Sequence, residues 1–322
     1  MKGTDDVLET LLLPFVSGRL QWSNDAVFLR ARFSSALAQL ANKELICEQS
    51  FKPETETLER AGFSVTSTLQ ESDAQRKFQI VLILPPRQRD EARALFARAK
   101  TLIKEGGIVI AAVSNNEGAR SLESDLEKLY GNINTLSKNK CRVFWAASNS
   151  NSVNQPIQDE WLSLDRARSI LNGKFISRPG VFAWDRVDVA SALLAQHLPD
   201  NLQGSAADLG AGYGYLSDAL LTKRPGITTL AVYEAEHRAL QLAKANLAKH
   251  ESQHHIHYCW HDVTSGLLEH YDVIVTNPPF HAQGSIDRPD IGRRFITIAA
   301  QSLRPGGQLW LVANRHLPYE AV

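Results

Sequence analysis

The stretch ADLGAGYGYLSDAL, residues 207–220, carries the strongest signal of the chain's architecture. Short apolar residues lead into glycines at alternate positions, Gly210, Gly212 and Gly214, and a stretch with helical spacing of leucines follows. Glycine has no Cβ, so it accepts left-handed backbone angles and lets a ligand approach bare main chain. The order predicts a strand, a turn that a ligand can approach, and a helix.

Strands and helices alternate on both sides of this turn. Apolar runs predict strands at 205–210, 228–234, 256–262, 271–277 and 307–314, and helical periodicity predicts helices at 191–198, 215–223, 237–250 and 291–303. Such alternation is typical of a doubly wound sheet of the Rossmann type, so the expected fold class is α/β.

The chain before residue 150 repeats part of this pattern. FQIVLILPPR (78–87) aligns without a gap on YDVIVTNPPF (271–280), and each is followed by a helical stretch, two glycines and an apolar strand. An internal duplication explains the match. We therefore expect two tandem Rossmann-like domains, at 1–150 and 160–322. The Asn/Ser-rich stretch at 148–158 is typical of a linker between them.

The two copies differ where a site would lie. Leu84 stands at the position of Asn277 and Arg87 at that of Phe280, and nothing in residues 1–77 resembles the glycine turn. We interpret the N-terminal copy as degenerate and non-catalytic, and the C-terminal copy as the catalytic domain.

Composition indicates an ordinary globular protein. Lys and Arg together number 35, as do Asp and Glu, so net charge gives no support to bulk nucleic-acid binding, although a local basic face remains open. Cys47, Cys141 and Cys259 form no paired motif, which predicts a reduced, cytoplasmic compartment. The sequence shows no signal-peptide pattern and no apolar run long enough to span a membrane.

Acidic residues flank the glycine turn. Asp208 precedes it, and Glu234 stands twenty residues after Gly214, where an acid can accept both hydroxyls of a ribose. The dinucleotide pattern GxGxxG fails, because Tyr215 and Ser217 stand where its third glycine would be needed. S-adenosylmethionine fits better, since its amino-acid end carries an ammonium that can be met through Asp208.

Asp262, at the end of the following strand, has two readings that the sequence leaves open. It is placed to accept the amino group of adenine, or it is an exposed carboxylate at a strand end.

Asn277, Pro278, Pro279 and Phe280 follow the third strand after the glycine turn. The exocyclic amine of a nucleobase is a poor nucleophile, because its lone pair is delocalised into the ring. The Asn277 side-chain oxygen and the Pro278 carbonyl can each accept one N–H and aim the nitrogen at a sulfonium methyl. Phe280 offers a face on which a flipped base can stack. The methylated amine becomes acidic and releases its proton to water.

These motifs together resemble a known family. DLGAGYG, the acid in VYE and TNPPFH resemble class I S-adenosylmethionine-dependent methyltransferases that methylate amines. RPGVFAWDRVDVASALL (178–194) and VANRHLPY (312–319), with the degenerate first copy, are similar to the bacterial ribosomal RNA guanine-N2 methyltransferases, of small-subunit type C or large-subunit type G.

The resemblance implies methyl transfer from S-adenosylmethionine to N2 of one guanine in ribosomal RNA, with 16S RNA as the main expectation and 23S RNA as the alternative. It implies that Phe182 and Asp188 are further cofactor-binding residues. It also implies that the catalytic domain lacks its last strands, since relatives continue where this chain stops at Val322. The expected partner is ribosomal RNA or a ribosomal subunit, and the protein is expected to be a monomer.

Other readings stay open. A similar loop would serve methylation of adenine N6 or of a protein glutamine, and a non-catalytic RNA-binding or assembly protein is a further alternative. Five histidines and a cysteine gather at 250–262, but their spacing fits no zinc motif, so no metal is expected. Basic side chains that could contact RNA are Arg87, Arg89, Arg93, Arg98, Lys100, Lys138, Lys140 and Arg142 in the first domain, and Arg293 and Arg294 in the second.

Overall fold

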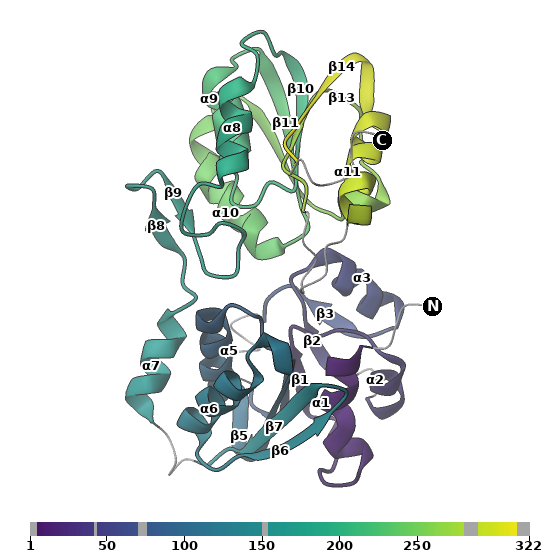
Figure 1. The fold of residues 1–322 in the computed structure, drawn as a ribbon, viewed down its shortest axis with the longest axis vertical. Helices are drawn as coiled ribbons and strands as arrows, with labels where there is room; N and C mark the ends of the chain where they lie inside the picture. Colours follow the sequence, from purple (N-terminus) through teal and green to yellow (C-terminus); the bar gives the residue numbers. More distant parts are fainter. Residues whose placement is uncertain (1–4, 42–43, 70–75, 150–153, 280–288, 314–322) are drawn as a thin grey trace. The chain divides into compact units, whose positions relative to one another are not determined.

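The computed structural model describes residues 5–41, 44–69, 76–149, 154–279 and 289–313. The chain divides into two compact units, Met1–Arg166 and Ala167–Val322. Each unit has a sheet of its own with helices packed against it, as Figure 1 shows.

The first unit contains a seven-stranded sheet in the order β3-β2-β1-β4-β5-β7-β6. The first five strands along the chain pair in parallel, whereas β7 runs antiparallel to both its neighbours, β5 and β6. The strands are β1 (Ala26–Leu29), β2 (Ile46–Glu48), β3 (Ser64–Thr66), β4 (Phe78–Ile83), β5 (Ile103–Ser114), β6 (Asn134–Lys138) and β7 (Cys141–Ala147).

Helices cover both faces of this sheet because the strand residues that point to each face are apolar. Val27 and Leu29 belong to one buried cluster, and the alternating Ala26 and Phe28 belong to the other. The first cluster includes side chains of α5 (Arg89–Leu102), α6 (Ala119–Tyr130) and α7 (Gln155–Ser163), with the short helix η1 (Asn115–Glu117) between α5 and α6 in the chain. The second includes side chains of α1 (Asp6–Val16), α2 (Ser35–Leu40) and α3 (Lys52–Arg60).

Helix α7 begins inside the stretch that composition predicted as a linker. The Asn154 side chain caps it by accepting a hydrogen bond from the backbone N–H of Ile157, and a proline lies in its first turn. Trp161 is buried against the first unit, with the guanidinium of Arg93 5.0 Å from the centre of its ring. The boundary between the units therefore falls after α7, later than the predicted linker.

The second unit contains a five-stranded parallel sheet in the order β12-β11-β10-β13-β14. Its strands are β10 (Gly204–Leu209), β11 (Ile227–Glu234), β12 (His255–Trp260), β13 (Tyr271–Thr276) and β14 (Leu303–Leu311), and a separate hairpin is formed by β8 (Arg168–Ile170) and β9 (Phe175–Ser177). The α/β class and the Rossmann-like order predicted from the sequence are confirmed.

The helices of the second unit also lie on two faces, as Figure 1 shows. Val232 packs in the cluster that holds α8 (Val189–His197), α9 (Tyr215–Lys223) and α10 (His237–Leu247). The next residue, Tyr233, packs in the cluster that holds α11 (Pro289–Gln301) and the short helix η4 (Val263–Ser265). Another short helix, η3 (Ala248–His250), follows α10.

The two sheets share an irregularity, which supports the duplication. The register of the β4–β5 pair shifts between Phe78 and Ile80, and that of the β13–β14 pair shifts between Tyr271 and Val273, the positions that the sequence alignment places together. Each following strand contains a glycine with positive φ, 72° in the first unit and 80° in the second. A bulge at matched positions is the feature that two copies of one ancestral sheet are expected to share.

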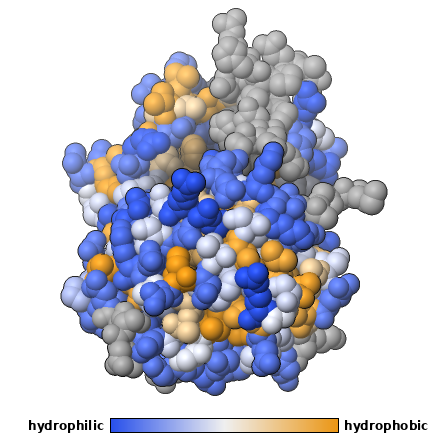
Figure 2. Space-filling view, turned by 60° about the horizontal axis from the view of Figure 1, so that its bottom comes forward, coloured by the Kyte–Doolittle hydropathy of each residue, from blue (hydrophilic) through white to orange (hydrophobic). Residues whose placement is uncertain are grey.

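Hydrophilic side chains cover most of the face drawn in Figure 2, with small hydrophobic areas between them. The exposed large apolar side chains of the described residues are Val16, Ile176, Phe182, Val189, Leu193 and Leu268. Within the same residues, no helix combines the length and the apolar character needed to cross a membrane.

Candidate active site

The carboxyl ends of three neighbouring strands bring predicted site residues together in the second unit. β10 lies between β11 and β13, and the last residues of all three stand side by side. Gly210 directly follows β10, Glu234 ends β11, and Asn277 directly follows β13. Ligands of open α/β sheets bind at this edge, so the strand order itself gathers these residues.

The three glycines of the turn have left-handed backbone angles, with φ of 74° at Gly210, 58° at Gly212 and 92° at Gly214. A Cβ added at Gly212 would meet nothing within 4 Å, so open space faces this residue. A Cβ at Gly214 would lie 3.3 Å from Cα of Ala243, because α10 packs closely against the turn. The turn therefore presents bare backbone on one side and a tight helix contact on the other.

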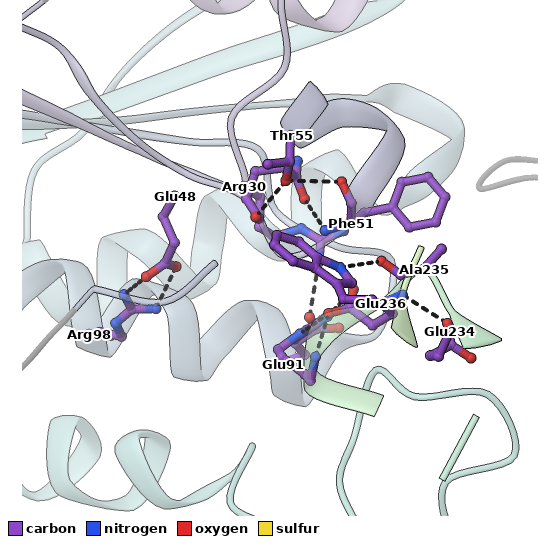
Figure 3. A network of polar contacts seen from close by, with 12 residues as sticks. Arg30, Glu48, Phe51, Thr55, Glu91, Arg98, Glu234, Ala235 and Glu236 are labelled. Carbon is purple, nitrogen blue, oxygen red and sulfur yellow. Dashed lines mark hydrogen bonds and ion pairs between the residues drawn. The ribbon is translucent and has the colours of Figure 1, made fainter. Parts of the chain in front are cut away.

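Glu234 ties the glycine turn to the end of β11. Its Oε2 accepts a hydrogen bond of 2.7 Å from the backbone N–H of Gly212. Its Oε1 accepts one of 2.8 Å from the backbone N–H of Glu236, and Figure 3 shows this second contact. Removal from water raises the pKa of Glu234 to about 7, although these hydrogen bonds act in the opposite direction. Whether this acid also holds a ribose stays a prediction.

Asp208 carries an unsatisfied oxygen in the interior. The side chain is fully buried, and Oδ2 accepts a 2.6 Å hydrogen bond from the hydroxyl of Ser217. Oδ1 is buried without a hydrogen-bond partner in the described part of the chain. Burial raises the pKa of Asp208 to about 6. An unpaired buried acceptor is costly, so this oxygen suits a ligand or a water molecule that donates a hydrogen.

Asn277 is fixed by two hydrogen bonds from its amide nitrogen. Nδ2 donates to Oδ2 of Asp188 and to Oγ of Ser191, both at 2.9 Å. Because an amide nitrogen has two hydrogens, both are used. Within the described residues no donor bonds Oδ1 of Asn277, so the carbonyl oxygen is the group left to accept from a ligand.

The remaining residues of this motif are placed only in part. Pro278 is buried and Pro279 is exposed. Phe280 lies outside the described residues, so its predicted stacking is not tested. Phe182 is 67% exposed, and its role in cofactor binding stays a prediction.

Asp262 caps the short helix η4. Its Oδ1 accepts hydrogen bonds from the backbone N–H of Thr264 at 2.9 Å and from the hydroxyl of Thr264 at 2.7 Å. These contacts explain why an acid follows β12, and an additional contact to adenine stays a prediction.

The histidines near the end of α10 bind other partners. Nε2 of His250 lies 2.8 Å from a carboxylate oxygen of Asp218, and Nδ1 of His254 lies 2.7 Å from the carbonyl oxygen of Ile227. The described residues contain no group of three side chains that could hold a metal ion.

Sequence reasoning missed the role that the structure gives to Ser191 and Asp188. Asp188 is the N-cap of α8 and accepts a hydrogen bond from the backbone N–H of Ser191. The signal for the cap was present, because an aspartate directly before an apolar run with helical spacing is a typical N-cap. Its contact with Asn277 could not be read from the sequence, since it joins two distant segments.

The first unit keeps only the start of this turn, without its glycines. By strand register, Arg30 corresponds to Gly210 and Gln49 to Glu234. Arg30 has a φ of 56°, close to that of its glycine counterpart. Gln49 accepts a 2.9 Å hydrogen bond from the backbone N–H of Phe51, the N-cap of α3, as Glu234 accepts one from that of Glu236, the N-cap of α10. This turn could not be predicted from the sequence, because every glycine of the motif is replaced in the first unit.

The groups that would hold a ligand are absent from the first unit's turn. Phe28 replaces Asp208 and is fully buried, and Leu84 replaces Asn277 and is buried. The guanidinium of Arg30 pairs with Glu91 at 3.1 Å, a contact that Figure 3 shows.

Most of the first unit's basic side chains that were considered for RNA binding have partners within that unit. Arg89 and Arg93 bond the fully buried Asp125 at 2.8 Å and 3.0 Å. The other pairs are Arg87 with Glu117, Arg98 with Glu48, Arg142 with Glu123, and Lys100 over the ring of Tyr130. Figure 3 shows the bidentate contact between Arg98 and Glu48. These partners argue against a basic surface composed mainly of free charges.

In the second unit, Arg293 is exposed, whereas Nε of Arg294 donates a 3.0 Å hydrogen bond to the carbonyl of Thr264.

Comparison with known proteins agrees with this architecture. The family model of the methyltransferase small domain matches residues 172–322. Ribosomal RNA small subunit methyltransferase C of Psychromonas ingrahamii is 29% identical over 89% of this chain and 81% of its own length. The enzyme of that name from Shewanella piezotolerans is 30% identical over 76% of this chain and 70% of its own length.

Ribosomal RNA large subunit methyltransferase G of Alcanivorax borkumensis is 35% identical, but over only 44% of this chain and 37% of its own length. Among solved structures, the T. thermophilus 16S rRNA N2 methyltransferase in complex with AdoMet and guanosine matches 99% of this chain and 86% of its own, with a TM-score of 0.79 and 26% identity. The resemblance drawn from the motifs is thus confirmed: the chain belongs to the ribosomal RNA small subunit methyltransferase C family of class I methyltransferases.

Proposed function

We propose that this protein transfers a methyl group from S-adenosylmethionine to the N2 amine of a guanine in 16S ribosomal RNA. The observation that carries the proposal is the Asn277 amide, which uses both nitrogen hydrogens within the protein and keeps its oxygen as an acceptor at the strand edge beside the glycine turn. The small-subunit relatives match most of their length, whereas the large-subunit relative matches a minor part.

The residues of the turn fit S-adenosylmethionine. Asp208 offers a buried oxygen without a protein partner, open space faces Gly212, and the half-buried Glu234 ends the neighbouring strand. Asp208 would hold the amino-acid end of the cofactor, and Glu234 would hold its ribose. The backbone at Gly212 would lie against the cofactor between them. When bound, it supplies a methyl carbon on a sulfonium sulfur; N2 forms the new bond to that carbon, and the sulfur keeps the electron pair of the bond that breaks.

The amine is held by the strand end. The Asn277 oxygen and the Pro278 carbonyl each accept one N–H of the guanine amine, and the two prolines limit the motion of this acceptor pair. As the nitrogen attacks, it gains positive charge, which the same oxygens stabilise. The methylated amine is acidic and releases one proton to water. Phe280 supplies the surface on which the base stacks.

We also propose that the first unit is a non-catalytic copy that does not bind S-adenosylmethionine. Phe28 and Leu84 stand where the second unit has Asp208 and Asn277, so the ligand-facing polar groups are missing. We further propose that the protein acts as a monomer in the cytoplasm on ribosomal RNA or a ribosomal subunit. The three free cysteines support a reduced compartment, and the family supports the RNA partner.

The test offers tritiated S-adenosylmethionine with small subunits, large subunits and free ribosomal RNA to the wild type and to Asn277→Ala. We expect label in small-subunit RNA, and a rate at least about a hundredfold lower in the variant, because a preorganised acceptor is lost. Asn134→Ala, the same change on the exposed strand β6, is the matched control and keeps wild-type turnover. Equal turnover in Asn277→Ala, or label confined to large-subunit RNA, contradicts the proposal.

A further inference from the structure

We infer that Asp188, together with Ser191, is a positioning residue that sets the orientation of the Asn277 amide and thereby the acceptor that meets the target amine. This inference rests on the proposed function. It assigns to Asp188 a role different from the cofactor contact that the family resemblance implies.

The side-chain amide of Asn277 can take two orientations that have nearly the same shape. Rotated by half a turn, the Asn277 side chain occupies the same space but exchanges its oxygen for its NH2 group. With the NH2 group facing a guanine amine, two hydrogen-bond donors would face each other, and the hydrogen bond that holds the amine would be lost. Catalysis therefore requires one of two orientations that are nearly equal in shape.

The carboxylate of Asp188 favours one of these two orientations of the Asn277 amide. Its Oδ2 lies 2.9 Å from Nδ2 of Asn277, and an ionised carboxylate can only accept. In the rotated state the Asn277 oxygen would face this carboxylate, placing two acceptors in contact. Ser191 accepts the second hydrogen at 2.9 Å, but a hydroxyl could also donate, so it distinguishes the orientations less strongly.

Asp188 is itself held in place by the start of helix α8. The same Oδ2 accepts a 2.9 Å hydrogen bond from the backbone N–H of Ser191, which makes Asp188 the N-cap of α8. Negative charge is favoured at a helix N-terminus, and the Ser191 side chain is buried. The rigid helix start thus carries both acceptors to Asn277, and little freedom remains to lose when the substrate binds.

The negative charge of Asp188 also has an electrostatic effect on the Asn277 amide. A carboxylate that accepts from Nδ2 polarises the amide and strengthens its oxygen as an acceptor. As the target nitrogen becomes positive, the charge of Asp188 acts on it through Asn277. The carboxylate therefore contributes to the rate in addition to holding the orientation.

Asp188→Ser tests this chain of contacts. Serine is also a good N-cap, so α8 keeps its cap, but its hydroxyl is too short to reach Asn277. We expect kcat to fall about ten- to a hundredfold, as for loss of one hydrogen bond to a charged group, while the Kd of S-adenosylmethionine changes less than about twofold. Asp188→Asn retains an oxygen at the same place without the charge, so its loss of kcat should be smaller.

The decisive readout is a double-mutant cycle with Asn277→Ala. If Asp188 acts through Asn277, Asp188→Ser lowers kcat less than about twofold further in the Asn277→Ala background. A multiplied loss in the double variant, wild-type kcat in Asp188→Ser, or a loss that appears in cofactor Kd rather than in kcat overturns the inference. Should Asp188→Ser not fold, Asp188→Asn carries the test, and unchanged kcat in that variant overturns it. The proposed function fails separately, when Asn277→Ala itself retains full turnover.

Discussion

Nδ2 of Asn277 lies 2.9 Å from Oδ2 of Asp188, although 89 residues separate the two in the chain. The bond joins the end of β13 to the start of α8, so the amide that we propose as the substrate's acceptor depends on a helix that precedes the glycine turn in the chain. The site is consequently a property of the folded unit rather than of the Asn-Pro-Pro-Phe motif alone.

The affinity for S-adenosylmethionine should depend on pH through Glu234. Its pKa is raised to about 7 by burial, and ribose hydroxyls donate best to the ionised form. Binding should therefore weaken as pH falls, by about tenfold between pH 8 and pH 6 for one proton. Calorimetric titration measures this. Glu234→Gln introduces the side chain that the first unit has at the matching position, Gln49, and this variant should bind S-adenosylmethionine weakly at both pH values. An equally steep pH dependence of binding in the variant would exclude Glu234 as the source of that dependence.

The same carboxyl should affect stability in the free protein. Because its pKa is higher in the folded than in the unfolded chain, the folded state holds the extra proton between about pH 4.5 and pH 7. The Glu234 contribution to the free energy of unfolding should therefore decrease as pH rises through this window. Urea unfolding of the wild type and Glu234→Gln checks the sign, and a difference that grows in the other direction would contradict it.

One molecule of S-adenosylmethionine should bind per chain. In the first unit Phe28 fills the position of Asp208, and Arg30 is paired with Glu91 beside the retained turn. Calorimetry should give a stoichiometry of one for the wild type and no binding for Asp208→Leu, which places an apolar side chain as the first unit does. A second equivalent of bound cofactor would contradict the assignment of the first unit as inactive.

Gly212→Ala should separate the effect of backbone strain on stability from the effect of the new methyl group on cofactor binding. Its φ of 58° disfavours alanine by about 1 kcal/mol, and no atom within 4 Å blocks the new methyl group in the free protein. We expect that loss in the free energy of unfolding and, in addition, weaker cofactor binding. Gly18→Ala is the control, because its φ is 73° with equally open surroundings in the first unit. A cofactor affinity that falls equally in both variants would contradict the placement of the ligand.

Asp125→Ala should destabilise the first unit without affecting the site. This buried carboxylate is bonded by Arg89, Arg93 and Lys128. Burial raises its pKa, but Arg89 and Arg93 outweigh burial and hold the pKa below its usual value. Removing it leaves the guanidinium groups without their shared partner, at a cost of about 3 kcal/mol in unfolding free energy.

The stability that Asp125 provides is present above its unfolded pKa and is lost as pH falls through its lower folded value. Glu127→Ala, an exposed change on the same helix, is the control and should cost little. Equal unfolding curves for the two variants would show that the buried cluster contributes nothing.

The alternation of strands and helices could be predicted because burial leaves a strong periodic signal. The doubly wound arrangement of the second unit could be predicted from this pattern and from the glycine turn. Asn277 and Glu234 could be chosen because their chemistry is unusual at a strand end. The order of the first unit's outer strands could not be predicted, since β2 and β3 are too short to show periodicity.

Long-range side-chain contacts left no signal in a single sequence. The bond between Asp188 and Asn277 and the retained turn at Arg30 became visible only when strand register placed distant residues together. Helix α7 was missed because an Asn/Ser-rich stretch also supplies a good cap, and the burial of Trp161 decided between linker and helix.

A single-turnover measurement of methyl transfer to 16S ribosomal RNA, with mass spectrometry of the digested nucleosides, tests whether the Asn277 oxygen holds the target amine. We expect the wild type to produce N2-methylguanosine, and Asn277→Ala to do so at least about a hundredfold more slowly with nearly unchanged affinity for S-adenosylmethionine. Methylation at another atom, or an equal rate in the variant, would contradict the assignment of the Asn277 oxygen as the acceptor that holds the target amine.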